Sequence, residues 1–134
     1  MLKVSDLMIK DVVTVDPDES VLEAACKMKE TGVSSLVVAR EKKVLGIITR
    51  SDFIDRVVSE AKDPRTTKAS EIMTRNVQTI SPDSGIMDAL RVMKENRFSQ
   101  LPVVSNDELV GIIAISDTLN YIAKFFLAAR WGQT

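Results

Sequence analysis

A duplication constrains the fold of this chain more than any other feature of its sequence. Shifting the sequence by 65 positions aligns residues 5–57 with residues 70–122 without a gap, and 18 of these 53 pairs are identical. A match that keeps its spacing through every turn indicates a repeated structural unit. One unit of about 55–60 residues is marginal as an independent fold. We therefore expect two units that share an interface and depend on each other.

Both repeats show the same order of apolar patterns and turn signals: a strand, a helix, a hairpin of two strands and a second helix. The first repeat predicts a strand over 12–15, a helix with a Ser20–Glu23 capping box that ends at Gly32, strands over 36–38 and 44–48, and a helix from Asp52 to about Ala61. The second predicts a strand over 77–80, a helix over 86–95, strands over 101–104 and 109–113, and a helix from Asp117. We expect an α/β (α+β) protein with domains over 1–61 and 70–134 and a linker over 62–69.

The composition excludes several classes of function. The net charge of −1 leaves no basic field that would hold nucleic acid or an anionic membrane, so neither is an expected partner. The chain has no histidine, and Cys26 is its single cysteine, so Ser-His and Cys-His catalysis and cysteine-rich zinc sites are absent. We expect no enzyme, no catalytic residue and no metal ligand. Because neither a signal region nor an apolar run of membrane-spanning length is evident, a cytoplasmic protein is expected.

One chemical feature recurs in both repeats. An apolar β-branched strand begins at Gly46 or Gly111 and ends at a Ser-Asp pair, Ser51-Asp52 or Ser116-Asp117, where a helix begins. A helix start offers free backbone N–H groups and a positive dipole end, both suited to phosphate. A carboxylate beside it can accept the hydroxyls of a ribose, as acidic residues do in dinucleotide-binding folds. These two motifs therefore indicate a nucleotide.

Each motif residue also has a purely structural alternative. An aspartate in the first turn of a helix is favourable without any ligand. Thr49 could reflect only the preference of β-branched residues for strands. Gly46 and Gly111 are expected to provide a bulge or a close approach to a ligand or a neighbouring strand. Recurrence of the whole Gly-to-Asp frame favours ligand contact for Asp52 and, less strongly, for Asp117.

The repeats resemble a tandem pair of cystathionine β-synthase (CBS) domains, a Bateman-type module, over about residues 4–123. The matching residues are Leu7-Met8 and Ile72-Met73, Thr-x-x-Pro at Thr14 and Thr79, Leu101-Pro102-Val103-Val104, and the two Gly-x-x-Thr/Ser-x-x-Asp frames. The resemblance implies two β-α-β-β-α units packed through their sheets with pseudo-two-fold symmetry. It also implies a stand-alone regulatory or sensor module that binds AMP, ADP, ATP or S-adenosylmethionine in clefts between the repeats and requires no cofactor.

Carried over residue by residue, the resemblance assigns two nucleotide clefts. The first would use Ile47, Thr49, Ser51 and Asp52 against Asn76, Gln78, Phe98 and Ser99. The second would use Ile112, Ser116 and Asp117 against Asp11, Val13, Val33 and Ser34. Candidates for phosphate contact are Arg50, Lys10 and Arg75. Ala114 stands where the family pattern has Thr or Ser, so the second cleft loses a hydroxyl and is expected to bind more weakly.

The resemblance also bears on partners. CBS pairs commonly form disc-like homodimers through their helices, and the C-terminal helix here carries Phe125, Phe126, Leu127 and Trp131. We expect a homodimer in which this helix is buried on more than one face. A sensor of this kind acts on a further protein, whose identity the sequence does not give. The alternative function is a ligand-free dimeric protein-interaction module.

Overall fold

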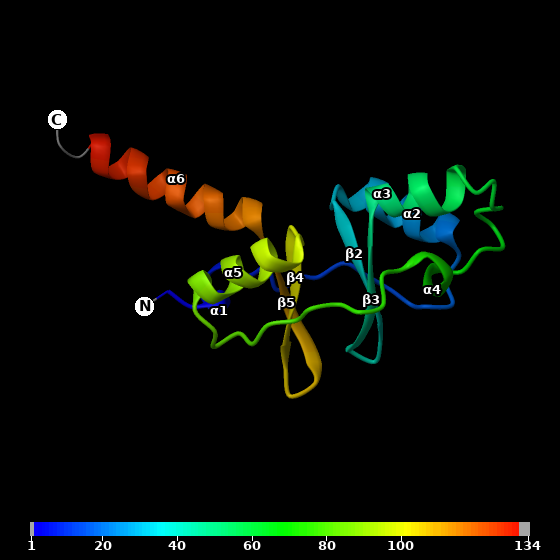
Figure 1. Cartoon of the computed structure of the whole chain (residues 1–134), viewed down its shortest axis with the longest axis horizontal. Helices are drawn as coiled ribbons and strands as arrows, with labels where there is room; N and C mark the ends of the chain where they lie inside the picture. The colour runs from blue at the N-terminus through cyan, green and yellow to red at the C-terminus, as the bar shows by residue number, and fades with distance from the viewer. Residues whose placement is uncertain (1, 132–134) are drawn as a thin grey trace. The chain divides into compact units, whose positions relative to one another are not determined.

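The computed structural model describes residues 2–131, which divide into two compact units (Figure 1). Unit 2 comprises residues 11–77 and 107–109, and unit 1 comprises the chain up to Lys10, residues 78–106 and the chain from Val110 onward. The first ten residues thus group with the second repeat. Residues 70–77, which follow the predicted linker, belong to the same unit as most of the first repeat. In each repeat, therefore, the N-terminal segment belongs to the compact unit that the other repeat mainly forms.

Unit 2 contains a three-stranded sheet and its helices. Its elements are β1 (Thr14–Val15), α2 (Val21–Thr31), β2 (Ser35–Arg40), β3 (Lys43–Thr49), α3 (Arg50–Phe53), the π-helical turn η1 (Ile54–Val58) and α4 (Ala69–Ile72). The strand order is β1-β2-β3, with β1 parallel and β3 antiparallel to β2. The predicted hairpin is confirmed. Its turn, Glu41-Lys42, takes positive φ angles of 52° and 67°, as a tight hairpin requires.

The core of unit 2 lies among the sheet, α2 and α4. The buried apolar residues are Val15, Val21, Ala24, Met28, Leu36, Val38, Ile48, Val57, Ala69, Ile72 and Met73. Three of these belong to the segment 69–73, which follows the predicted linker. The linker itself is bonded to α2, because the carbonyls of Thr67 and Pro64 accept the Val21 and Leu22 amides at 2.8 and 2.9 Å. These bonds satisfy amides that a helix start leaves without intrahelical partners.

Unit 1 has the same plan on a smaller sheet. Its elements are α1 (Val4–Leu7), α5 (Ile86–Asn96), β4 (Gln100–Ser105), β5 (Glu108–Ala114) and α6 (Ile115–Trp131), with β4 beside β5. Its core contains Val4 from the N-terminal segment, which is 0% exposed, together with Met93, Leu101 and Ile113. The strand predicted over 77–80 is wrong: only Ile80 forms a bridge, parallel to Val103. One bridge is too short to make a strand.

Several predicted boundaries differ from the structure. The strand over 12–15 is reduced to Thr14–Val15, and the helix predicted from Asp52 to Ala61 begins at Arg50 and passes into the π-turn that ends at Val58. Ser20 caps α2 by accepting the Glu23 amide at 3.1 Å. The reciprocal bond from the Glu23 carboxylate, which completes a capping box, does not form between these described residues. Gly32 ends α2 with φ 73°, as predicted.

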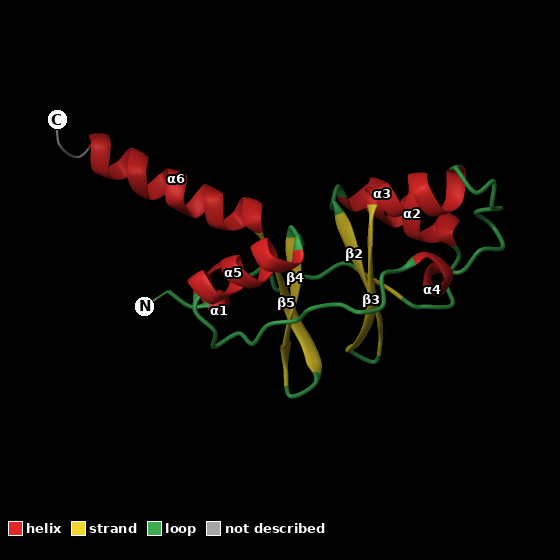
Figure 2. Cartoon of the chain, viewed as in Figure 1, coloured by secondary structure: helices red, strands yellow, loops and turns green. Residues whose placement is uncertain are grey.

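Figure 2 draws α6 as one continuous helix. Most of its apolar side chains are exposed in the single chain, and their burial in a homodimer stays a prediction. Thr118, near its start, is 2% exposed, whereas Phe125 and Phe126 are 66% and 68% exposed. Leu119, Tyr121, Ile122 and Leu127 are also exposed. The side chain of Trp131 lies outside the described part. Among residues 2–131, no helix combines the length and apolar character needed to cross a membrane.

Candidate functional site

Both motif glycines allow a neighbouring segment to come close to the strand. A Cβ placed on Gly46 would lie 2.5 Å from the Met73 sulfur and 2.8 Å from the Thr74 carbonyl oxygen. One placed on Gly111 would lie 2.6 Å from the Met8 sulfur and 3.1 Å from the carbonyl of the next residue. The glycines thus permit a close approach, although to a neighbouring loop segment and not to the facing strand. At Gly46 the strand pairing also shifts register, from Val38–Gly46 to Ala39–Val44, as a bulge would do. The approaching group is the methionine segment of α4 or α1.

The first motif gathers three polar side chains where β3 passes into α3. Asp52 Oδ2 accepts the backbone N–H of Thr49 at 2.8 Å and its hydroxyl at 3.3 Å. The hydroxyls of Thr49 and Ser51 are 3.0 Å apart. Asp52 is 9% exposed, and Ser51 is exposed. The arrangement caps the helix, and it also presents hydroxyl groups and a carboxylate side by side, which is the donor and acceptor set that a ribose phosphate needs.

Arg56 lies beside this cluster, and the sequence analysis did not single it out. Its Nε is 3.6 Å from Asp52 Oδ1. The same guanidinium donates to the carbonyls of Ile72 and Met73 at 2.9 and 3.2 Å. The spacing of four residues from Asp52 is a signal that could have identified the ion pair. The contacts with α4 could not be found this way, because they join residues far apart in the sequence.

The second motif has the same backbone geometry and fewer polar groups. Asp117 Oδ2 accepts the Ala114 N–H at 3.1 Å, the equivalent of the Asp52–Thr49 bond. The amide of Ile115 donates to the Ser99 carbonyl at 2.9 Å. With alanine at position 114, the hydroxyl that Thr49 provides in the first motif is missing, and Ser116 is the equivalent of Ser51. Asp117 therefore caps α6 in the same way, but it has fewer polar neighbours that could bind a phosphate.

The remaining predicted residues are divided between the units. Of the first set, Ile47, Thr49, Ser51, Asp52 and Asn76 belong to unit 2, and Gln78, Phe98 and Ser99 to unit 1. Of the second set, Ile112, Ser116 and Asp117 belong to unit 1, and Asp11, Val13, Val33 and Ser34 to unit 2. Within unit 2, Ile47 exchanges two backbone hydrogen bonds with Thr74. The two-sided clefts stay predictions.

The three candidates for phosphate contact are all exposed. Arg75 donates to the Ser70 carbonyl at 3.2 Å, which holds its guanidinium near α4. Arg50 begins α3, and Lys10 lies at the end of the N-terminal segment of unit 1. Neither of these two side chains forms a hydrogen bond or ion pair with another residue of the described range. Their role in binding phosphate stays a prediction.

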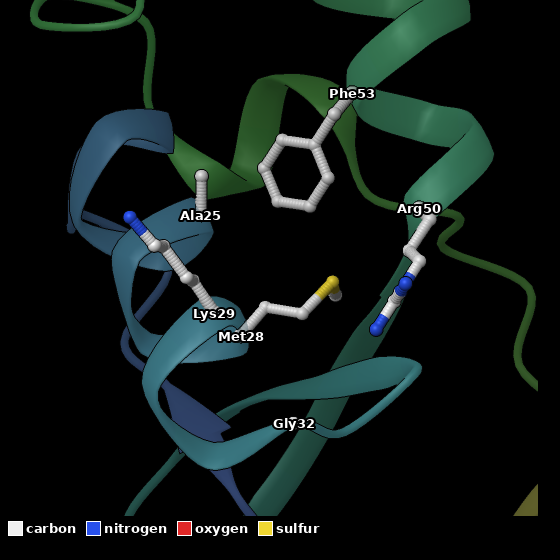
Figure 3. Close-up of a pocket in the computed structure, with 6 residues that line it drawn as sticks. All are labelled: Ala25, Met28, Lys29, Gly32, Arg50 and Phe53. Atoms are coloured by element: carbon white, nitrogen blue, oxygen red, sulfur yellow. The ribbon is translucent and has the colours of Figure 1, made fainter.

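Unit 2 also contains a pocket that sequence reasoning did not find. It has a volume of about 460 Å³ and is lined by Ala25, Met28, Lys29, Gly32, Arg50 and Phe53. Figure 3 shows Phe53 and Met28 pointing into the space between α2 and α3, whereas the Lys29 amino group points away from it. A neighbouring pocket of about 260 Å³ shares Ala25 and Phe53. The two hollows form an apolar depression along the helices of this unit.

The described residues contain no group of three or more histidine, cysteine, aspartate or glutamate side chains that could hold a metal ion. Cys26 is exposed and free. Met28, Met73 and Met93 are buried in the cores, where they act as apolar packing residues. In the described part of the chain, both motifs provide hydrogen-bonding groups, and the first also contains the Asp52–Arg56 ion pair.

Fold and motifs together define a class: a duplicated mixed α/β module with one polar strand-to-helix junction in each repeat. The CBS domain family matches residues 4–59 and again residues 69–124, and the chain therefore belongs to this family. The resemblance noted from the sequence is confirmed. As a CBS domain pair, the chain is a regulatory module.

Relatives and solved structures are consistent with this assignment. An uncharacterised protein of Methanopyrus kandleri is 36% identical over 120 residues, covering 88% of this chain and 61% of that protein. Inosine-5′-monophosphate dehydrogenase of Methanocaldococcus jannaschii is 38% identical over 130 residues, covering 96% of this chain and 25% of the enzyme. The chain thus spans only part of the length of either relative. The crystal structure of the CBS domain pair of protein MJ0100, in complex with 5′-methylthioadenosine and S-adenosyl-L-methionine, has a TM-score of 0.83 and 28% identity, covering 92% of this chain and 98% of that one.

Proposed function

We propose that this chain is a sensor that binds an adenosine ligand at its first motif and passes the signal to another protein. The observation that carries the proposal is the cluster at the β3–α3 junction, where Asp52 is held in place by Thr49 and stands beside two hydroxyls. A carboxylate with one oxygen committed to the helix keeps the other for a ribose hydroxyl. The ligand is AMP, ADP, ATP or S-adenosylmethionine, and no cofactor is required.

The comparison with protein MJ0100 supports the adenosine part of this ligand. That CBS pair is similar over nearly its whole length and was solved with two molecules that share an adenosine and differ in the 5′ substituent. Recognition of the common part fits a site that holds the ribose through a carboxylate. The first motif of this chain offers such a carboxylate, and Arg50 and Arg75 are candidates for contact with a 5′ phosphate.

The test is titration calorimetry of the protein with AMP, ATP and S-adenosylmethionine, accompanied by thermal unfolding. A ligand that binds only the native state raises the melting temperature, and the stabilisation grows with the logarithm of its concentration once this exceeds the dissociation constant. We expect saturable binding of at least one of the three. Guanosine monophosphate is the matched control, because it has the same ribose and phosphate with a different base. No binding of any adenosine compound at millimolar concentration would contradict the proposal.

The exposed apolar face of α6 favours a second function, a dimeric protein-interaction module whose motifs act only as helix caps. Six large apolar residues of this helix are between 39% and 68% exposed. Exposed apolar surface of this kind marks an interaction site in a soluble protein. Under this second function the chain forms homodimers and shows no response to adenosine compounds. The titration therefore separates the two functions.

A further inference from the structure

We propose that Arg56 positions Asp52 for its ligand and couples occupancy of the first motif to residues 72–74. The proposal rests on the proposed function, because it concerns the same aspartate. Every contact that it uses lies within unit 2. Arg56 is therefore a positioning residue, which acts on the ligand through Asp52.

The contact at Asp52 determines which carboxylate oxygen can serve a ligand. Oδ2 already accepts the N–H and the hydroxyl of Thr49. The Arg56 Nε lies 3.6 Å from Oδ1, the oxygen that remains. The Asp52 side chain is 12% exposed and the Arg56 side chain is 47% exposed. The hydrogen bonds at Oδ2 and the ion pair at Oδ1 together restrict rotation of the carboxylate and favour one direction of Oδ1 toward a ribose hydroxyl.

The guanidinium also contacts the C-terminal end of α4. One terminal nitrogen donates to the carbonyls of Ile72 and Met73, at 2.9 and 3.2 Å. These carbonyls lie at the C-terminal end of α4, where helix carbonyls lack intrahelical partners. A guanidinium is planar and its donors have a fixed geometry. A displacement of α4 would therefore turn the Arg56 plane and change its contact with Asp52.

The same short segment also contacts the beginning of the motif. Thr74 and Ile47 exchange backbone hydrogen bonds of 2.9 and 3.1 Å, and the Met73 side chain packs on Gly46. Residues 72–74 thus hold the motif at its first residues directly and at Asp52 through Arg56. This segment ends three residues before Val77, after which the chain passes into unit 1. Occupancy of Asp52 is thereby connected to one of the places where the chain passes between the units.

The second repeat provides a comparison without the arginine. The 65-residue shift places Tyr121 at the position of Arg56. Met8 packs on Gly111, and Ile9 pairs with Ile112, so the segment contacts at the start of the motif are kept. Among the described residues, Asp117 forms no ion pair with a cation. The coupling is therefore expected at the first motif and not at the second.

Arg56 also has two simpler explanations. An i,i+4 ion pair on a partly exposed helix surface contributes little to stability, and a cation near the motif could act only by attracting a phosphate. Adenosine separates the second explanation from positioning, because it has the ribose and no phosphate. If Arg56 attracts phosphate alone, its removal weakens AMP binding and leaves adenosine binding unchanged. If it positions Asp52, both ligands lose affinity by the same factor.

The experiment is calorimetry of the parent protein and the Arg56→Met variant with adenosine and with AMP. We expect both dissociation constants to rise about five- to tenfold, the effect of disturbing a hydrogen bond to a charged group. Arg56→Lys keeps the charge and loses the planar fork, so its loss should be intermediate. Arg65→Met is the matched control, since Arg65 is an exposed cation of the same unit whose side chain contacts no partner in the described range. Circular dichroism and thermal unfolding establish that each variant is folded.

Hydrogen exchange tests the coupling itself. In the parent, adenosine should slow exchange of the Thr74 amide, which donates to Ile47, and this slowing should be absent in Arg56→Met and Arg56→Lys at saturating adenosine. If the parent binds no adenosine compound, the proposed function fails and this proposal with it. This proposal is overturned, while the proposed function stands, if the parent binds and Arg56→Met binds adenosine and AMP as tightly as the parent does. It is also overturned if adenosine slows exchange at Thr74 to the same extent in the variants as in the parent.

Discussion

Asp52 and Asp117 each accept the backbone N–H of the residue three positions earlier, at 2.8 and 3.1 Å. This bond stabilises the start of the following helix, so both aspartates have a structural task without any ligand. The surroundings distinguish them: Asp52 has the Thr49 hydroxyl and the Arg56 guanidinium within reach, whereas Asp117 has neither equivalent. Any substitution of these aspartates therefore acts on stability as well as on binding.

We predict that Asp52→Ala weakens adenosine-ligand binding by roughly one to two orders of magnitude, because a charge-assisted hydrogen bond to ribose contributes about 1.5–3 kcal/mol. Asp117→Ala should lose less, since Ala114 leaves that motif without the equivalent of the Thr49 hydroxyl. Calorimetry with AMP measures both. Asp52→Asn and Asp117→Asn keep an oxygen that can accept the capping amide, so they separate the loss of charge from the loss of the cap. Equal losses at the two positions would refute the asymmetry.

Gly46 supports a second prediction at this scale. Gly46→Ala should lower the free energy of unfolding by about 1–3 kcal/mol, the usual effect of overpacking a filled site. The added methyl group would meet the Met73 side chain and the Thr74 carbonyl, and the carbonyl cannot move without breaking its bond to Ile47. Urea unfolding measures the change as a shift of the midpoint, provided that the dependence of the unfolding free energy on urea concentration is unchanged. Gly111→Ala should behave alike, and an unaltered midpoint for Gly46→Ala would show that the segment yields without strain.

At the scale of elements, the short helices α1 and α4 are more important than their length of four residues suggests. Each supplies buried residues to a unit that is built mainly from another part of the sequence: Val4 to unit 1, and Ala69, Ile72 and Met73 to unit 2. Dividing the chain in the 62–69 linker therefore removes a core segment from each half.

We predict that the fragments 1–61 and 70–134 do not fold cooperatively when expressed apart, and that neither binds an adenosine ligand. The fragment 11–77 keeps α4 with its sheet and should show the better dispersed amide spectrum and the sharper urea transition. Its length of roughly 65–70 residues lies within the range in which small domains can fold alone. Cooperative unfolding of 1–61 to the same degree as 11–77 would show that α4 is dispensable for this core.

The order of elements could be predicted because each repeat carries its own turn and cap signals. Helix α2 was placed correctly from Ser20 and Gly32, and the hairpin from the polar residues between two apolar runs. The predicted strand over 77–80 failed, because its apolar pattern forms a single bridge at Ile80. The contacts of the linker with α2 and those of Arg56 with the Ile72 and Met73 carbonyls could not be predicted. Each joins residues well separated in the sequence, and local patterns carry no information on such pairs. At the site, the structure brings together Thr49, Ser51 and Asp52 of the first motif, while ligand contact by these residues and the opposite walls of both clefts stay predictions.

At the scale of the whole molecule, the exposed apolar residues of α6 bear on assembly. Phe125, Phe126 and Leu127 are at least 56% exposed, and a single chain leaves them in contact with water. Burial against another polypeptide would remove this surface from water, and each Å² of apolar area buried contributes about 25 cal/mol of favourable free energy. The homodimer expected from the sequence would provide such burial.

We predict a homodimer at about tens of micromolar, a concentration at which dimers of ordinary affinity are populated. The double substitution Phe125→Ser and Phe126→Ser should shift sedimentation toward the monomer, because it removes two large apolar side chains from the exposed face. Ser116→Ala on the same helix is a conservative change away from this face and should leave the association unchanged if adenosine ligands are absent. A monomeric parent at these concentrations would contradict the prediction.

The exchange of N-terminal segments between the repeats has a consequence for synthesis. Val4 donates to the Ser84 carbonyl and Ile9 to that of Ile112, so residues 2–10 are synthesised well before the residues with which they form these hydrogen bonds. At ~5–20 residues per second, the delay between Val4 and Ser84 is roughly 4–16 s. Residues 11–77 are contiguous and can assemble during that interval. The nascent chain can therefore fold most of unit 2 while residues 2–10 still lack the partners that unit 1 supplies.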